Sequence, residues 1–245
     1  SQALLARRKK GKTAFLQRLY NIFWSQPEGN VVPFYFSVPE TKTTLESFSK
    51  EFFTAFSTQY ISFVTRNPQL VATPPDFVML RPHLTDSFFV DLYDSIRLSE
   101  TSNDWNAMWR TASRAPSFAA FTFGRKVVQI LDEFQNIDSY VYDYRGERID
   151  SMSGTYLDLA EKRQAPLIVS GSEVHGLIRI IRRLTDRFIE STLENLPEDE
   201  ARQAIEVYAD FSGTRIDETA VQRIWNLTQG DPLYIKALFV SRFNS

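Results

Sequence analysis

Cysteine is absent from this chain of 245 residues, and histidine occurs only twice. The lack of cysteine excludes disulfide bonds and thiolate metal sites, and it fits a reducing compartment. The two histidines, His83 and His175, are far apart in the sequence, which disfavours a histidine-rich metal site. Any binding or catalytic site in this chain is therefore expected to use other side chains.

Long apolar runs are missing as well. No run approaches the roughly 18 residues that suggest a membrane span, and the N-terminus lacks the apolar core and cleavage site of a signal peptide. We therefore expect a cytoplasmic location and no membrane partner. Strong charge of one sign is also lacking, because the formal net charge is −2. The chain as a whole is thus not a binder of polyanions.

Glycine is scarce, at 9 residues, which is below the average share of about 7%. Hydrophobic residues make up 43% and charged residues 24% of the chain, an ordinary balance for a globular protein. Phenylalanine is abundant, at 20 residues. The phenylalanines at 48, 52, 56 and 63 have helical spacing, which favours packing of a helix against a sheet over a partner-binding stripe.

Apolar strand candidates alternate with segments of helical periodicity along most of the chain. This alternation predicts an α/β fold with a parallel sheet covered by helices on both faces. The final part of the chain shows helical periodicity only. We place a domain boundary near Leu196–Pro197, with an α/β domain over 1–196 and a small helical lid over 197–245. The strand candidates cover residues 2–5, 31–38, 126–134, 166–172 and 188–196.

The stretch A-R-R-K-K-G-K-T, residues 6–13, follows the first strand candidate and precedes a helix candidate. It is close to G-x-x-x-x-G-K-[ST], the loop that holds nucleotide phosphates. Gly11 allows the backbone to turn its N–H groups toward a phosphate. Lys12 is expected to reach the β and γ phosphates and Thr13 to bind Mg²⁺. The alternative is a solvated basic patch or a nucleic-acid contact. The candidate phosphate-binding residues are Arg8, Lys9, Lys10, Gly11, Lys12, Thr13 and Ala14.

The strand candidate over residues 126–134 is an apolar run that ends in two acids, Asp132 and Glu133. This is the form of a Walker B element. We expect Asp132 to hold Mg²⁺ together with Thr13, and Glu133 to polarise the attacking water as general base. The alternative is a strand-ending turn with solvated carboxylates.

The next strand candidate ends in Ser170-Gly171-Ser172. In a parallel sheet its end lies at the same edge as the two motifs above, where ligands bind. Ser170 or Ser172 is expected to hydrogen-bond the γ-phosphate or the water, and Ser170 is the preferred candidate. Ser-Gly-Ser is also common in turns, so this signal is weak when taken alone.

Taken together, these motifs resemble the ASCE-type P-loop ATPases, and within them the AAA+/STAND branch. The chain is most similar to the archaeal-type ATPases that also occur in bacteria. The resemblance covers nearly the whole chain and rests on RRKKGKTAFLQRL, VVQILDEFQNID, APLIVSGSEV, LTDRFIESTLENLPEDEA and IWNLTQGDPLYIKAL.

The resemblance implies a sheet of strand order 5-1-4-3-2 with a C-terminal helical lid. It also implies roles for two further residues. Arg187, before the fifth strand, matches an arginine that faces the nucleotide site or a neighbouring subunit, which makes it a catalytic candidate. Pro232, in Gly230-Asp231-Pro232, matches a lid proline that packs against adenine.

The chain departs from the pattern in two respects. Ala6 stands where the loop normally has its first glycine, and alanine tolerates an extended φ but not a positive one. The resemblance also implies flanking segments before the first strand and after the lid, so we expect a part of a larger protein.

The resemblance implies a domain that binds ATP or ADP with Mg²⁺ and hydrolyses ATP to reset a switch between sheet and lid. Other domains of the same protein, a protein partner or an oligomer are the expected partners. One alternative is a scaffold, with or without nucleotide, that acts through protein contacts. A further alternative, supported only by the basic clusters and by what related ATPases do, is an ATPase that acts on DNA.

Overall fold

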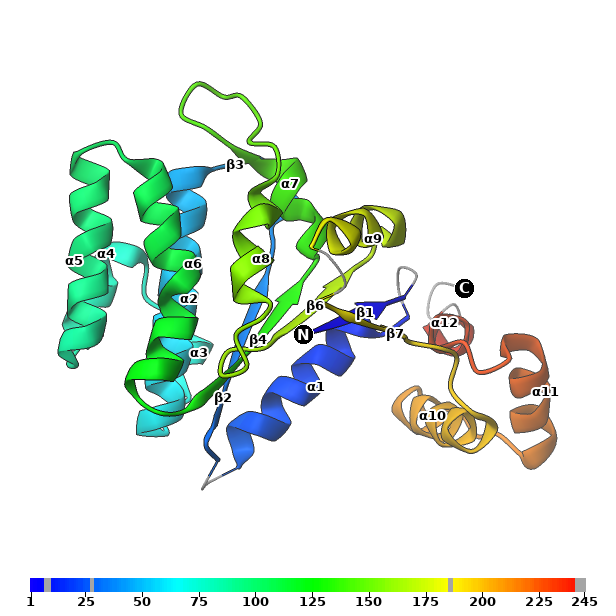
Figure 1. Ribbon diagram of the computed structural model, residues 1–245. Helices are drawn as coiled ribbons and strands as arrows, with labels where there is room; N and C mark the ends of the chain where they lie inside the picture. Colours follow the sequence, from blue (N-terminus) through cyan, green and yellow to red (C-terminus); the bar gives the residue numbers. More distant parts are fainter. Residues whose placement is uncertain (7–9, 27–28, 185–186, 241–245) are drawn as a thin grey trace.

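The computed structural model describes residues 1–6, 10–26, 29–184 and 187–240. Its centre is a sheet of five parallel strands in the order β2-β4-β6-β1-β7 (Figure 1). When the five strands of this sheet are numbered 1 to 5 along the chain, the order from the β7 edge is 5-1-4-3-2. The expected fold class and strand order are therefore confirmed. The strands are β1 (Gln2–Leu5), β2 (Val31–Ser37), β4 (Lys126–Asp132), β6 (Leu167–Gly171) and β7 (Ile189–Thr192).

The register of the strands brings their carboxyl ends to one edge of the sheet. Leu5 pairs with Gly171 on one side and with Thr192 on the other. Asp132 pairs with Ser37 at the end of β2. The segments that follow β1, β4 and β6 therefore begin side by side, although they are distant in sequence.

Helices cover both faces of the sheet, as the alternating pattern predicts. On one face, Leu16 of helix α1 packs with Leu4, Val128 and Ile130. On the opposite face, α2 packs against β2, α6 against β4 and α9 against β6, and α5 packs outside α2 and α6. The helices are α1 (Lys12–Ser25), α2 (Leu45–Thr65), α5 (Ser87–Thr101), α6 (Trp105–Thr122) and α9 (Val174–Arg183). No helix in the described part of the chain combines the length and apolar character of a bilayer-spanning segment.

The phenylalanine stripe of α2 lies in the core, as its spacing predicts. Phe52 meets Phe34 and Phe36 of β2 edge-on, each at 5.1 Å between ring centroids, and Trp109 of α6 at 5.4 Å. Edge-to-face packing places the positive rim of one ring against the negative face of the next. Phe48, Phe56 and Phe63 are buried in the same cluster.

Strand β2 lies at the edge of the sheet, consistent with Pro33 inside it. The Gln59 side chain of α2 accepts from the Tyr35 N–H and donates to the Tyr35 carbonyl, both at 2.8 Å. Gln59 thereby satisfies backbone groups that an edge strand leaves open to another strand.

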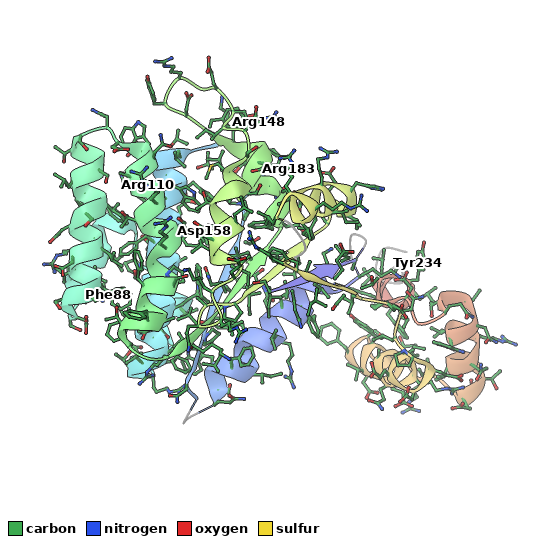
Figure 2. All side chains as sticks on the ribbon, viewed as in Figure 1. Phe88, Arg110, Arg148, Asp158, Arg183 and Tyr234 are labelled. Atoms are coloured by element: carbon green, nitrogen blue, oxygen red, sulfur yellow. The ribbon has the colours of Figure 1, made fainter. Side chains whose placement is uncertain are left out.

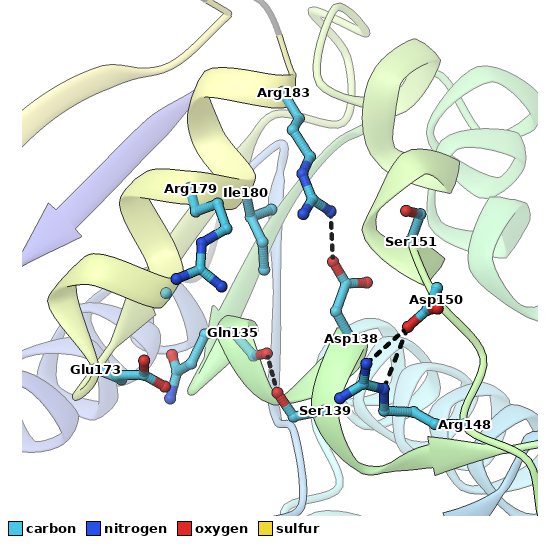
Figure 3. A pocket seen from close by; sticks show the side chains of 11 residues that line it. Gln135, Asp138, Ser139, Arg148, Asp150, Ser151, Glu173, Arg179, Ile180 and Arg183 are labelled. Atoms are coloured by element: carbon cyan, nitrogen blue, oxygen red, sulfur yellow. Dashed lines mark hydrogen bonds and ion pairs between the residues drawn. The ribbon is translucent and has the colours of Figure 1, made fainter.

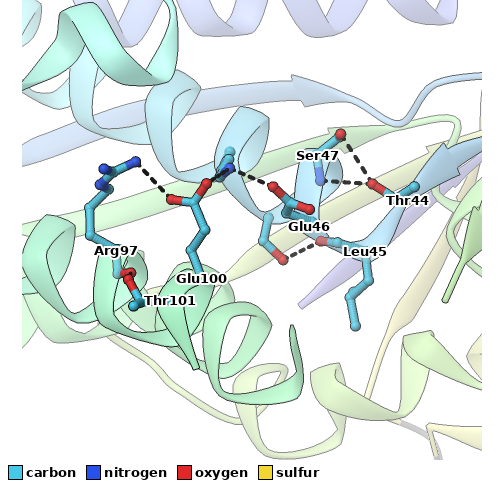
Figure 4. Close-up of polar contacts among 9 residues, drawn as sticks. Thr44, Leu45, Glu46, Ser47, Arg97, Glu100 and Thr101 are labelled. Carbon is cyan, nitrogen blue, oxygen red and sulfur yellow. Dashed lines mark hydrogen bonds and ion pairs between the residues drawn. The ribbon is translucent and has the colours of Figure 1, made fainter. Parts of the chain in front are cut away.

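Thr43 and Glu46 have the spacing of a capping box, but helix α2 begins one residue later than this spacing indicates. Thr44 is the N-cap, and its hydroxyl accepts from the Ser47 N–H at 3.1 Å. Further along α2, Lys50 donates to Glu46 at 2.6 Å and to Glu100 of α5 at 2.7 Å (Figure 4). These contacts join α2 to α5 beside the aromatic core.

The connections contain several short elements, and of these only α8 (Tyr156–Leu159) lies where the residue pattern, over 156–164, favours a helix. A two-stranded parallel sheet pairs Thr43–Thr44 with Val141–Tyr142. The remaining short elements are α3 (Gln69–Ala72), α4 (Phe77–Leu80), η1 (Arg81–His83), η2 (Phe134–Asn136), α7 (Ile137–Tyr140), η3 (Met152–Thr155) and α8 (Tyr156–Leu159), with β3 (Thr43–Thr44) and β5 (Val141–Tyr142) forming the small sheet.

The segment after β7 is helical, and it packs around a hydrophobic cluster of its own. Figure 2 shows Tyr234 on this unit, at the far side of the molecule from Phe88. The helices are α10 (Glu198–Phe211), α11 (Glu218–Thr228) and α12 (Pro232–Val240). The cluster consists of Ala201, Ile205, Ala209, Val221, Ile235 and Phe239.

Candidate functional site

The loop after β1 turns into α1 at Gly11, whose φ of 84° and ψ of 10° lie in the left-handed region. Only glycine adopts this conformation without strain. Helix α1 begins immediately after it, with Lys12, Thr13 and Ala14 in its first turn. The amino end of α1, which is the positive end of its dipole, thus lies at the carboxyl edge of the sheet. Arg8 and Lys9 lie outside the described residues.

Lys12 is buried, with 5% of its surface exposed. Its Nζ donates to the carbonyl oxygen of Ala6 at 3.1 Å. Ala6 is itself buried and is not among the described residues with positive φ. Alanine therefore fits the backbone at the position where the loop pattern has its first glycine.

Asp132, at the end of β4, is the most enclosed acid of the site, with 1% of its surface exposed. Its Oδ2 accepts from the Thr13 hydroxyl at 2.7 Å and from the Tyr35 hydroxyl at 3.2 Å. Its Oδ1 accepts from the Glu133 N–H at 3.0 Å and from the Ser170 hydroxyl. These donors satisfy a buried carboxylate that would otherwise be costly to desolvate.

Ser170 is fully buried and donates its hydroxyl to Asp132. The adjacency of β4 and β6 brings these two side chains together inside the sheet edge. The expected contact of Ser170 with the γ-phosphate or the water stays a prediction.

Tyr35 of β2 is a site residue that the sequence reasoning missed. Its side chain points to the α1 face, opposite to Phe34 and Phe36, and so reaches Asp132. Burial raises the pKa of the Tyr35 hydroxyl well above its ordinary value, and the nearby Asp132 charge raises it further. Tyr35 therefore stays protonated and remains a hydrogen-bond donor. The two-residue alternation of β2 was the available signal.

Glu133 follows Asp132 and has a left-handed backbone, with φ of 52°. Its Oε2 accepts from the Ser172 N–H at 3.0 Å, the Ser172 hydroxyl at 2.7 Å and Gln135 Nε2 at 2.6 Å. The end of β4 is thereby joined to the end of β6. Left-handed backbone at a residue other than glycine costs free energy and is common at functional sites.

Lys10 connects the loop after β1 to the helical segment. Its Nζ forms an ion pair with Asp231 Oδ2 at 2.5 Å and also donates to Asn195 Oδ1. Asp231 Oδ1 in turn accepts from the Leu233 N–H at 3.0 Å, at the start of α12. Pro232 is the first residue of α12 and lies directly beside this ion pair in the chain.

These residues occupy the carboxyl edge of a parallel sheet of order β2-β4-β6-β1-β7, with a Gly-Lys-Thr turn after β1. No protein-family model and no curated protein matches the chain. A solved structure, the Walker-type ATPase PABY2304 of Pyrococcus abyssi, matches with a TM-score of 0.60 and 16% identity, over 100% of this chain and 63% of that one. The chain has the P-loop ATPase fold.

A second solved structure, the ORC2 protein of Aeropyrum pernix in its ADP form, matches with a TM-score of 0.44 and 12% identity. This match covers 99% of the present chain and 55% of that one. The likeness is too low to support a conclusion. The chain spans less than two thirds of both structures, so it corresponds to only part of their length.

The P-loop ATPase fold does not bring Arg187 to the cluster around Asp132. Arg187 precedes β7, and the start of β7 lies at the amino edge of the sheet, where the Ile189 N–H bonds to the Ser1 carbonyl. Its guanidinium pairs with Glu161 at 2.7 Å and donates to the Leu157 carbonyl at 3.2 Å. Arg187 is therefore not a catalytic residue for its own chain's cluster. Contact with a neighbouring subunit remains a prediction.

A polar cavity of about 520 Å³ lies beside the cluster, between α9 and the segment after β4 (Figure 3). Ion pairs line it, with Arg183 and Asp138 at 3.7 Å and Arg148 and Asp150 at 3.0 Å. Gln135, which binds Glu133, also lines this cavity. The charges in its wall are balanced, which gives the cavity no preference for an anion.

Proposed function

We propose that this chain is a Mg²⁺-dependent ATP-binding and ATP-hydrolysing switch domain of a larger protein. The observation that carries the proposal is the hydrogen bond of 2.7 Å between Thr13 and Asp132. It joins the Gly-Lys-Thr turn to the acidic end of β4, as a site for phosphate and metal requires. The P-loop ATPase fold supports the same conclusion.

In this proposal the phosphates lie at the amino end of α1. The backbone N–H groups of the turn point toward them, and the helix dipole favours their negative charge. Lys12 exchanges its bond to the Ala6 carbonyl for the β and γ phosphates. The backbone of residues 8–14 completes the phosphate cradle, and Pro232 packs against adenine.

The metal proposed here is Mg²⁺, held by Thr13 and Asp132. A hydroxyl and a carboxylate are the hard oxygen ligands that Mg²⁺ prefers, and Mg²⁺ usually takes one or two protein ligands besides phosphate and water. The two oxygens already lie 2.7 Å apart, so the residues present fit this ion. When bound, Mg²⁺ would neutralise charge on the phosphate oxygens. Ser170 and Tyr35 hold the Asp132 carboxylate in place.

Glu133 is the proposed general base. It lies beside Asp132 and is half-buried, so its carboxylate is both near the metal ligands and open to water. The Lys10–Asp231 ion pair links the same loop to the lid. Movement of the loop on nucleotide binding or hydrolysis would therefore move the lid, which is the proposed switch. The proposal further includes the cytoplasm as location, and other domains, a protein partner or further copies as partners of the lid.

The test combines nucleotide binding by calorimetry with the rate of ATP hydrolysis in the presence of Mg²⁺. Lys12→Ala is expected to weaken ATP and ADP binding by at least about tenfold. The matched control is Lys126→Ala, an exposed lysine at the amino end of β4. Glu133→Gln is expected to bind ATP normally and to lose hydrolysis. No binding by the unmodified chain would support the scaffold instead, and full hydrolysis by both Lys12→Ala and Glu133→Gln would end the catalytic assignment.

A further inference from the structure

Glu133 is held through only one of its two carboxylate oxygens. The three donors, two from Ser172 and one from Gln135, all bind Oε2. Oε1 accepts no hydrogen bond from the described residues. Among the described residues, one oxygen is thus fixed and the other has no donor.

Gln135 is well placed to act as a fixed donor. It is 5% exposed, and its Nε2 also contacts Asn136 Oδ1 at 3.2 Å. Asn136 donates in turn to the Val38 carbonyl at 3.2 Å, which ties the group to the end of β2. The reverse orientation of the Gln135 amide would place its oxygen against the Glu133 carboxylate, so the carboxylate decides the orientation.

Gly171 explains how the Gln135 side chain fits. A Cβ on Gly171 would lie 2.0 Å from Gln135 Oε1 and 3.0 Å from its Cδ. Gln135 Oε1 is buried, accepts no hydrogen bond within the described part of the chain, and rests against the Gly171 backbone. The backbone of Gly171 is an ordinary strand without positive φ. Glycine at position 171 is therefore explained by the space that the Gln135 side chain occupies. It is not explained by a turn conformation.

We propose that Gln135 and Ser172 are positioning residues for Glu133, and that Gly171 is required because it admits Gln135. This inference rests on the proposed function. Gln135 and Ser172 hold Glu133 Oε2 so that Oε1 faces the attacking water. Oε1 takes a proton from the water as the water oxygen bonds to the γ-phosphorus. The bond between the γ-phosphorus and the bridging oxygen breaks, and ADP leaves with that oxygen. A carboxylate free to rotate spends less time in this geometry, which lowers the rate of the chemical step.

The first test uses Gln135→Ala, Gly171→Ala and the double variant. Each single variant is expected to lower kcat by about tenfold or more, with KM for ATP and the Kd of a non-hydrolysable ATP analogue unchanged within about twofold. Gly171→Ala should act by displacing the Gln135 amide, so it should have no further effect in the Gln135→Ala background. Gly154→Ala is the matched control, since Gly154 has no positive φ and open space around it.

The second test does not depend on hydrolysis. In a ¹H–¹⁵N spectrum, the Gln135 side-chain amide is expected to give a downfield, slowly exchanging proton that disappears in Glu133→Ala and in Gly171→Ala. Ser172→Ala removes one of the three donors and keeps the Ser172 N–H. It provides a milder variant, with a loss in kcat smaller than that of Gln135→Ala, should the buried Gln135→Ala change prevent folding.

The outcomes separate the inference from the proposed function. If Glu133→Gln abolishes hydrolysis but Gln135→Ala and Gly171→Ala turn over normally, the positioning roles are wrong and the proposed function stands. If Gly171→Ala lowers kcat by the same factor with and without Gln135, its effect does not pass through Gln135 and that step is wrong. If Glu133→Gln hydrolyses ATP at the unmodified rate, both the base assignment and the inference are overturned.

Discussion

Thr13 Oγ1 donates to Asp132 Oδ2 at 2.7 Å, across 119 residues of sequence. The bond joins the first turn of α1 to the end of β4. The two residues meet because β1 and β4 are parallel, have only β6 between them, and end at the same edge of the sheet. The hydrogen bond joins the two residues that are proposed as ligands of Mg²⁺.

Thr13→Val is expected to raise the Mg²⁺ concentration needed for half-maximal ATP binding and hydrolysis by at least about tenfold. Valine keeps the shape of the side chain but removes the oxygen that binds Asp132 and, in the proposal, the metal. Thr13 is exposed, so unfolding in urea should change by less than about 1 kcal/mol. The control is Thr65→Val, an exposed threonine near the end of α2. An unchanged Mg²⁺ requirement would argue against Thr13 as a ligand.

Lys10 and Asp231 are expected to couple the phosphate loop to the lid. Their side chains are only 16% and 12% exposed, so removal of one charge leaves the other enclosed. Lys10→Met and Asp231→Asn should each destabilise the docked lid, and their double-mutant cycle should show a coupling of roughly 1 kcal/mol. The measurement is urea unfolding together with limited proteolysis of residues 193–197.

The control for this cycle is the pair Arg148 and Asp150, whose side chains are 56% and 78% exposed. Solvent screens such a pair, so its coupling should stay below about 0.5 kcal/mol. Equal coupling in the two cycles would mean that Lys10 and Asp231 form an ordinary surface contact.

Gly230→Ala is expected to disrupt the contact between the turn before α12 and Leu196, which precedes α10. Gly230 has φ of +73°, and a Cβ there would lie 2.0 Å from the Leu196 carbonyl oxygen. Gly213 has φ of +64° with open space around it, so Gly213→Ala isolates the cost of the backbone conformation, about 1 kcal/mol. Gly230→Ala should cost at least about 2 kcal/mol more. Equal unfolding free energies for the two variants would show that the close approach is relieved without cost.

Acid stability is expected to depend on Lys50 and Glu100. The hydrogen bond from Lys50 is the largest cause of a lowered pKa at Glu100. A lowered folded-state pKa contributes stability above the unfolded value of about 4.3, and this stability is lost as pH falls through the folded-state pKa. Lys50→Met should therefore lose less stability than the unmodified chain when urea unfolding is measured from about pH 5 to pH 2. Lys236→Met, an exposed lysine of α12, should leave the pH dependence unchanged.

Lys50 itself contributes in the opposite range. Burial lowers its pKa, but the hydrogen bonds to Glu100 and Glu46 outweigh burial, and the net pKa is raised from 10.5. A raised folded-state pKa gives stability that is present below the unfolded value and lost as pH rises through the folded value. The network therefore stabilises the chain between these two limits.

Much of the fold follows from local patterns. Apolar runs with the right periodicity locate the five strands and the main helices, because burial of one face imposes that periodicity. The order of the strands came from family resemblance, which the topology confirms. The Gly-Lys-Thr turn and the acid pair after β4 were recognisable because each is a local motif at a strand end.

The contacts of the site were harder to predict. Arg187 has the right position in the sequence but lies at the amino edge of the sheet, paired with Glu161. Ser170 donates to Asp132, a contact that the Ser-Gly-Ser stretch does not indicate. Tyr35 was missed because its contact with Asp132 depends on which face of β2 turns toward α1. In each case the partner lies on another element, so no local spacing specifies it.

The sequence by itself determined which segments are strands, which are helices, and where residues suited to phosphate and metal occur. Hydrophobic periodicity and strand-end chemistry are properties of neighbouring residues, and they can be recognised along the chain. The tertiary structure alone decided which of these residues meet. It placed Ser170 on Asp132, Lys10 on Asp231, and Gln135 in the space that Gly171 leaves. These pairings arise from the parallel register and close packing of distant segments, whose geometry no single segment contains.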